Sequence, residues 1–194
     1  MDDLNGTPPL RVAVIMGSTR EGRVCDAVTG WFAEVARRRR ELDVSVLDLA
    51  GYDFPARYPR RVTDAMCAFT AQIGRAEAFV IVCPEYNRSF PAPLKQAIDY
   101  GYDEWQAKPV GFVAYGGRSR GVYAVEQLRS VFTELHAMTV RDFVGLDLFN
   151  GETDDACRPC GTDDQMRAAA AMLDQLTWWG LALRAARSAR PYAS

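Results

Sequence analysis

The sequence is poor in histidine, and this scarcity limits the chemistry that the chain can perform. His136 is the single histidine among 194 residues, so a metal site built from several histidines is excluded. The same residue is the one candidate for the base of a Ser-His-Asp or Cys-His arrangement. It lies in a helical pattern that ends before a strand, where a packed or capping histidine is the more frequent role, and this role is the one we expect.

The chain also lacks an excess of basic charge and a long apolar segment, and its first residues do not resemble a signal peptide. Its 23 lysines and arginines stand against 25 aspartates and glutamates, giving a net charge of −2 without the basic footprint of a nucleic-acid-binding protein. No apolar run approaches the ~20 residues needed to cross a bilayer. The acidic start of the chain, residues 1–5, differs from the basic and apolar start of a signal peptide. We therefore expect a cytoplasmic protein with neither a nucleic-acid nor a membrane partner.

The cysteines do not have the spacing of a metal site. There are five cysteines, and an odd number without a secretion signal favours free thiols. Cys157 and Cys160 form a CxxC pair, but a zinc site would need two further ligands, and the sequence has neither a second CxxC nor a histidine pair. The pair lies in a polar loop late in the chain, whereas the thioredoxin motif follows the first strand of its fold. We predict no metal site, and a redox role for the pair stays open.

What the sequence does contain is an alternation of apolar, β-branched segments with helical patterns. The segments that predict strands are residues 11–16, 44–49, 78–83, 109–115 and 139–144. The helical patterns cover residues 23–40, 63–75, 94–104, 122–136 and 165–187. Because most of these strands are apolar throughout, they indicate a parallel sheet with helices on both faces. The alternation fits an α/β, three-layer, flavodoxin-like doubly wound sheet with five parallel strands in the order 2-1-3-4-5.

The domain organisation that follows is simple. Residues 11–187 form one domain, which suits a chain of this length. Residues 1–10 are predicted to be a flexible N-terminal tail and residues 188–194 a C-terminal tail.

In this strand order the first and third strands mark the point where ligands bind, beyond the carboxyl ends of the strands. The loop after the first strand contains Gly17, Ser18, Thr19, Arg20, Glu21, Gly22 and Arg23. Its glycines let the backbone approach an anion, its hydroxyls and amides can donate hydrogen bonds, and the following helix adds a positive N-terminus. Arg20 can supply a charge-assisted fork to a phosphate. We predict an anion site here, with a plain strand-to-helix turn as the alternative.

Two better-known phosphate motifs are absent from this loop. A Walker A loop requires Lys and Ser or Thr at the positions of Arg23 and Val24. The dinucleotide fingerprint also fails, because Ser18 and Thr19 follow Gly17 without a glycine triad. A monophosphate is therefore favoured over a nucleoside triphosphate or a dinucleotide as the tightly held group.

Two further loops start at the same edge of the predicted sheet. Residues 84–93 contain three prolines, an aromatic ring and an asparagine, and such a stiff loop could frame a planar heterocycle or be merely structural. In residues 115–121, Gly116 and Gly117 permit a close approach of the backbone to a ligand. Arg118 and Arg120 could meet a second anionic group, such as a cofactor phosphate, or could be solvated.

The three loops together resemble those of the NADPH-dependent FMN reductase family of flavodoxin-like proteins. The resemblance extends from about Arg11 to Leu148 and rests on GSTREG after the first strand, PEYN followed by PAPLKQAIDY (residues 91–100), and YGGRSRG after the fourth. It implies bound FMN and hydride transfer to it from NADPH or NADH as co-substrate. The electrons would then pass to a small-molecule acceptor (free flavin, a quinone, an azo compound or metal ions) or to a partner monooxygenase. It also implies a homodimer or homotetramer.

The resemblance further implies which residues bind the cofactor. The set is Gly17, Ser18, Thr19, Arg20, Gly22, Arg23, Pro84, Glu85, Tyr86, Asn87, Tyr115, Gly116 and Gly117. Ser18, Arg20 and Arg23 would contact the phosphate. The PEYN loop would border the isoalloxazine ring, mainly through backbone groups, and Gly116 and Gly117 would approach its pyrimidine end.

The sequence departs from the family pattern at a few positions. The family often has Ser where Arg23 stands and Asn where Gln96 stands, and residues 150–163 match nothing in it. Because hydride passes directly between nicotinamide and flavin, no side chain is required as a catalytic proton donor, and none is named. The alternative to a reductase is a flavin-bearing electron carrier or redox-sensing protein without significant turnover.

Overall fold

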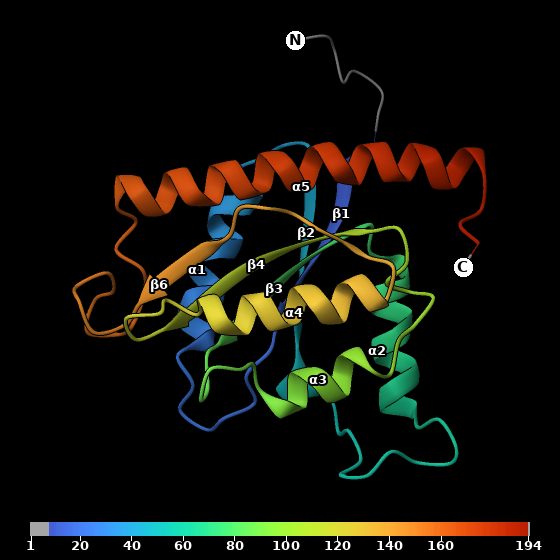
Figure 1. Cartoon of the computed structure of the whole chain (residues 1–194), viewed down its shortest axis with the longest axis horizontal. Helices are drawn as coiled ribbons and strands as arrows, with labels where there is room; N and C mark the ends of the chain where they lie inside the picture. Colours follow the sequence, from blue (N-terminus) through green and yellow to red (C-terminus); the bar gives the residue numbers. More distant parts are fainter. Residues whose placement is uncertain (1–7, 194) are drawn as a thin grey trace, which may run out of the picture.

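A six-stranded parallel sheet forms the centre of the computed structural model, which describes residues 8–193 (Figure 1). The strands are β1 (Leu10–Met16), β2 (Leu42–Asp48), β3 (Ala78–Pro84), β4 (Pro109–Gly116), β5 (Met138–Thr139) and β6 (Val144–Asp147). The helices are α1 (Cys25–Arg37), the short 3₁₀ turn η1 (Leu49–Gly51), α2 (Asp64–Arg75), α3 (Ala92–Ile98), α4 (Val122–Glu134) and α5 (Asp163–Ala189). The order β2-β1-β3-β4-β5 confirms the predicted flavodoxin-like topology.

Each face of the sheet carries its own apolar core, because successive side chains of a strand point to opposite faces. On one face Ile81 and Phe112 pack with side chains of α2, α3 and α4. On the other face Val80 and Val113 pack with side chains of α1 and α5. Figure 1 shows α5 lying along one side of the sheet, with α2, α3 and α4 on the other. The central strand β3 is buried along its whole length, whereas the edge strand β2 is partly exposed.

The predicted fifth strand at residues 139–144 is wrong in detail, because two short strands, β5 and β6, take its place beside β4. Between them, the amide of Val140 still donates to the carbonyl of Val110 in β4 at 2.9 Å, but side chains bind the other backbone groups. Arg129 of α4 donates to the carbonyls of Val140 and Arg141 at 2.6 and 2.7 Å, and the amide of Asp142 donates to Gln175 at 3.1 Å. The pairing is therefore interrupted where α4 and α5 satisfy the backbone groups.

Helix α3 is shorter than the predicted helix at residues 94–104. It begins at Ala92 with Pro93 in its first turn, and it ends at Ile98. The indole of the buried Trp105 donates to the carbonyl of Ile98 at 3.1 Å, so a side chain packed beneath the helix end binds this carbonyl.

The domain is slightly longer at both ends than the predicted residues 11–187. Leu10 lies in β1 and is fully buried, while residues 1–7 lie outside the described residues. Helix α5 continues to Ala189, and beyond it Tyr192 contacts His136 through a hydrogen bond of 2.8 Å to Nδ1. His136 itself follows α4 instead of lying within it, with a positive φ of 56°.

Candidate functional site

The carboxyl ends of β1, β3, β4 and β6 meet at one edge of the sheet and enclose a cleft of about 420 Å³. This volume lies in the range typical of small-molecule and cofactor sites. Nine of the thirteen predicted site residues line the cleft: Arg20, Gly22, Arg23, Pro84, Glu85, Tyr86, Tyr115, Gly116 and Gly117. The other predicted residues are Gly17, Ser18, Thr19 and Asn87.

The loop after β1 connects this strand to the N-terminus of α1. The amide of Gly17 donates to the carbonyl of Val82 at 2.8 Å, and a Cβ at Gly17 would lie only 3.0 Å from Leu94. Glycine at this position therefore holds the start of the loop against β3 and α3, beneath the ligand-facing part. Helix α1, which follows, has Val24 at its N-cap and no side chain bonded to its first amides. Such an N-terminus is suited to an anion.

Ser18 and Arg20 differ in how accessible they are to a ligand. Ser18 is 1% exposed, and its hydroxyl lies 3.4 Å from the amide of Arg20 and 3.5 Å from the hydroxyl of Tyr86. Thr19 and Arg20 are exposed. Within residues 8–193 the guanidinium of Arg20 makes no hydrogen bond or ion pair, so its donors are available to a bound group.

Arg23 has all five of its N–H donors bound by protein oxygens. It forms a bidentate pair with Asp48 at 2.6 and 2.5 Å and a second one with Asp26 at 3.0 Å for both bonds. The fifth bond, 2.7 Å long, goes to the carbonyl of Ser18 in the loop. These hydrogen bonds hold the pKa of Asp48 below its ordinary value. Arg23 therefore ties the loop to the end of β2 and to the first turn of α1, and a phosphate contact would require one of these bonds to break.

The loop after β3 turns sharply directly beyond the cleft. Tyr86 and Ser89 pair through two backbone hydrogen bonds of 2.8 and 3.0 Å. The two residues between them, Asn87 and Arg88, have positive φ of 50° and 66°, as in a type I′ turn. Asparagine tolerates this conformation better than most residues do. Asn87 thus lies at the tip of a turn, outside the cleft lining, where it forms the hairpin that presents Tyr86.

Glu85 links the second loop to the third. Its carboxylate accepts hydrogen bonds from the hydroxyl of Ser119 at 2.8 Å and from the amide of Tyr123 at 3.0 Å. The second bond caps the first turn of α4, where a negative charge is favourable. The backbone amide of Glu85 donates to the carbonyl of Tyr115 at 2.8 Å. Pro84, Glu85 and Gly116 are consequently held in one rigid wall.

The cleft has further lining residues that sequence reasoning missed: Val24, Leu148 and Phe149. Phe149 is 81% exposed, and its ring lies beside Gly117. Leu148 is fixed by a bond of 2.9 Å from its amide to the carbonyl of Gly116. The available signal was positional, because the segment after the last strand of a parallel sheet opens onto the same edge.

The two arginines of the third loop lie in different surroundings. Arg120 forms an ion pair with Glu152. Arg118 is exposed and makes no hydrogen bond or ion pair among residues 8–193. Arg118 therefore keeps all of its donors available for a second anionic group, whereas Arg120 keeps only those that Glu152 does not engage.

Three buried titratable groups lie in the wall of the cleft or directly behind it, and all of them are protonated at neutral pH. Burial raises the pKa of the Tyr115 phenol and of the Cys25 and Cys83 thiols. None of them is arranged to release a proton to a ligand at neutral pH, which agrees with a chemistry that needs no acid or base from the protein.

The CxxC pair occupies a separate hairpin. The carboxylate of Asp154 accepts from the amides of Ala156 and Arg158, and the amide of Cys160 donates to the carbonyl of Glu152 at 3.0 Å. Cys157 and Cys160 carry free thiols. Over residues 8–193, no cluster of three or more histidine, cysteine, aspartate or glutamate side chains could hold a metal ion, and no helix has the length and apolar character of a membrane span.

Comparisons with known proteins agree with this geometry. Residues 10–151 match the family described as NADPH-dependent FMN reductase. An NAD(P)H-dependent FMN reductase of Schizosaccharomyces pombe is 36% identical over 131 residues, 62% of this chain and 64% of that protein, so the chain spans less than two thirds of this relative. A quinone reductase of Pseudomonas putida is 32% identical over 164 residues, covering 76% of this chain and 87% of that protein.

The fold is shared with a solved structure as well. FerB, a flavoenzyme NAD(P)H:(acceptor) oxidoreductase from Paracoccus denitrificans, superposes with a TM-score of 0.75 and 18% identity. The superposition covers 89% of this chain and 98% of that one. At this identity the likeness shows the fold alone.

Proposed function

The chain belongs to the NADPH-dependent FMN reductase family, and on that premise we propose that it binds FMN in the cleft at the ends of β1, β3 and β4 and uses NADPH or NADH to reduce it. The observation that carries the proposal is the available guanidinium of Arg20 beside the uncapped N-terminus of α1. A phosphate is the group that this pair of features recognises best.

The chemistry of the cleft fits a flavin at both ends. At the phosphate end lie Arg20 and the α1 amides. At the other end a rigid wall of Pro84, Glu85 and Gly116 presents backbone groups beside the aromatic side chains of Tyr86 and Phe149. A planar heterocycle with a polar edge matches a wall of backbone groups and aromatic rings.

When bound, FMN supplies the chemistry itself by accepting hydride from the nicotinamide and passing electrons to an acceptor. The protein binds FMN and orients it. Arg20 neutralises phosphate charge, Arg23 holds the loop in its binding conformation, and Glu85 fixes the wall of the ring site. Backbone amides near Gly116 would stabilise negative charge at the pyrimidine end. No side chain is assigned a proton-transfer role.

The finer features of the proposal concern the acceptor, the nicotinamide and the assembly. Quinones and free flavin are the acceptors that we propose, supported by the named activities of the relatives. Arg118 favours NADPH, since its donors are available for a phosphate. A homodimer or homotetramer, and electron delivery to a partner monooxygenase, remain part of the proposal. Tyr86 is 38% exposed and Phe149 is 81% exposed at the rim of the cleft. These exposed aromatic side chains support a contact with another subunit or a partner protein at the rim.

The test of the binding site compares FMN with riboflavin, which lacks the phosphate. Arg20→Ala should weaken FMN binding by about 10- to 150-fold, the effect of losing a hydrogen bond to a charged group, and leave riboflavin binding unchanged. The matched control is Arg61→Ala, at an exposed arginine outside the cleft lining. An unchanged dissociation constant for FMN would remove Arg20 from the site.

The test of turnover is steady-state kinetics with NADPH and NADH against excess FMN and a benzoquinone. Continuous oxidation of the nicotinamide supports the reductase. Bleaching of one equivalent of bound flavin without further turnover would instead identify an electron carrier, and a protein that binds no added FMN would refute the proposal at its first step.

A further inference from the structure

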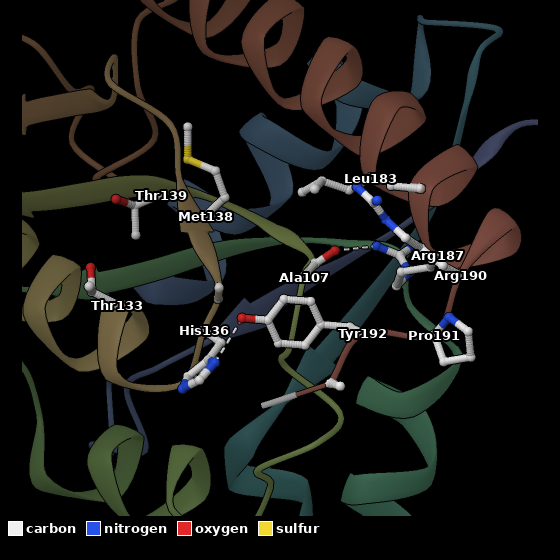
Figure 2. A pocket seen from close by; sticks show the side chains of 13 residues that line it. Ala107, Thr133, His136, Met138, Thr139, Leu183, Arg187, Arg190, Pro191 and Tyr192 are labelled. Carbon is white, nitrogen blue, oxygen red and sulfur yellow. Dashed lines mark hydrogen bonds between the residues drawn. The ribbon is translucent and has the colours of Figure 1, made fainter.

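A second and larger cavity, of about 710 Å³, lies at the opposite edge of the sheet (Figure 2). It is bordered by Ala107, just before β4, by the end of α4, by β5 and by the last turns of α5. The proposed flavin cleft lies where the strands end, whereas this cavity lies where β4 and β5 begin. Nothing in the proposed function uses it.

The walls of the cavity are largely apolar. The aliphatic part of the lining comes from Ala137 and Met138 on one side and from Leu183, Ala186 and Pro191 on the other. Figure 2 shows Met138 and Leu183 approaching the cavity from different elements, β5 and α5. A cavity of this size with such walls suits the apolar body of a small organic molecule.

Two arginines on α5 and directly after it add positive charge to this apolar cavity. Arg187 is partly buried and donates to the carbonyl of Ala107, and Arg190 is exposed. Within the described part of the chain, neither guanidinium has a carboxylate within ion-pair distance. Arg184, one turn earlier, is different, because it forms a bidentate pair with Glu77 at 2.8 and 2.6 Å.

Arg187 and Arg190 therefore differ from Arg184 in having no carboxylate bonded to the guanidinium within residues 8–193. Burial lowers the pKa of Arg187, and the charge of Glu77 opposes this shift only in part, because the Glu77 carboxylate is paired with Arg184. Arg190 makes no side-chain hydrogen bond in residues 8–193, although its backbone amide donates to the carbonyl of Ala186. Both guanidinium groups therefore keep donors for an anion that enters the cavity.

The chain after α5 closes one side of the cavity. The hydroxyl of Tyr192 lies 2.8 Å from Nδ1 of His136, and the two rings stack edge to face with centroids 5.7 Å apart. Figure 2 shows the Tyr192 ring between His136 and Pro191. This contact joins residues 56 positions apart and gives the cavity an aromatic wall.

We propose that this cavity is a binding site for a small amphipathic anion, an organic carboxylate or sulfonate with an aromatic or aliphatic body. The body lies between Met138, Leu183 and the Tyr192 ring, and the anionic group lies at Arg187 and Arg190. The site is independent of flavin binding, because the two cavities share no lining residue.

The probe for this site is naphthalene-1-sulfonate, titrated calorimetrically into the purified protein with and without saturating FMN. A ligand of this size should bind at one site with a dissociation constant of about 0.1–1 mM, and FMN should not displace it. The uncharged 1-naphthalenemethanol should bind at least about tenfold more weakly, since it lacks the charge-assisted bonds.

Variants assign the binding to this cavity. Arg190→Ala should weaken sulfonate binding about tenfold or more. Ala186→Glu should abolish it, because the new carboxylate would pair with Arg190 four residues later and repel the anion. Both positions are exposed, so both variants should fold. The control is Arg167→Ala, which removes an exposed arginine of the same helix outside the cavity lining.

Three results would overturn the proposal: no binding of the sulfonate at millimolar concentration, equal affinity for the uncharged alcohol, or affinity unaffected by both Arg190→Ala and Ala186→Glu. Displacement of the probe by FMN would place it in the flavin cleft instead. A failure of FMN to bind would leave this titration interpretable, since the sulfonate is measured in the absence of FMN as well.

Discussion

Replacing Arg23 by alanine should weaken both the fold and the proposed flavin site, although Arg23 has no donor left for the phosphate. Its side chain is 11% exposed and its five N–H groups bind Asp48, Asp26 and the carbonyl of Ser18. Arg23→Ala removes all five bonds, and Asp48, which is 39% exposed, recovers part of the loss by hydration. We expect a loss of about 1.5–3 kcal/mol in unfolding free energy, which lowers Tm by about 3–12 °C.

The effect on binding arises from the loop. Without Arg23, the carbonyl of Ser18 has no anchor, and ordering one or two loop residues on binding costs about 1–3 kcal/mol. FMN affinity should therefore fall by about 5- to 150-fold. Arg23→Lys should not restore it, because an ammonium cannot form the same planar, bidentate bonds.

The assay combines FMN titration with thermal unfolding of the protein without FMN, for Arg23→Ala and Arg20→Ala in parallel. Arg20→Ala should lower FMN affinity and leave Tm unchanged, whereas Arg23→Ala should lower both. If Arg23→Ala reduces FMN affinity with an unchanged Tm, Arg23 contacts the phosphate directly and its role as an anchor is refuted.

The same pair has a pH dependence with a defined sign. Because Arg23 lowers the pKa of folded Asp48, the pair adds stability above the unfolded carboxyl pKa of about 3.9 and loses it as pH falls through the lower folded value. The difference in Tm between wild type and Arg23→Ala should therefore shrink below about pH 4. A difference that stays constant from pH 7 to pH 3 would contradict the assigned ion pair.

Three further substitutions test other parts of the structure. Burial lowers the pKa of Lys108 to about 8, so the unfolded chain binds the proton more tightly than the folded chain does. The free energy of unfolding should therefore rise by about 2 kcal/mol between pH 7.5 and 10. Lys108→Met should remove this rise in urea unfolding, and an unchanged dependence of the unfolding free energy on pH would refute the reasoning. Gly121→Ala should cost about 2–4 kcal/mol, because Gly121 has φ of 81° and a Cβ there would lie 2.5 Å from that of Ala114; a variant as stable as wild type in the same urea assay would contradict this. Glu85→Ala should weaken FMN and riboflavin alike by about 5- to 30-fold, since it releases the wall of the ring site; an effect on FMN alone would place Glu85 at the phosphate end.

Much of the fold could be predicted because its signals are local. The apolar runs at β1, β3 and β4 differ from the helical periodicity between them, and doubly wound sheets bring their loops to one edge. The split of the fifth strand was not predictable, because it depends on Arg129 and Gln175, which come from two different helices.

The sequence by itself determined the strand order and the three loops of the proposed flavin cleft, since both follow from local patterns and from the chirality of parallel connections. The tertiary structure alone decided what each polar group in those loops can do. Arg20 and Arg23 are three residues apart in one loop, yet the pairing of β1 with β2 brings Asp48 to Arg23 and leaves Arg20 available. The second cavity depends in the same way on a contact between His136 and Tyr192. Such contacts depend on distances between side chains far apart in the chain, which no local pattern records.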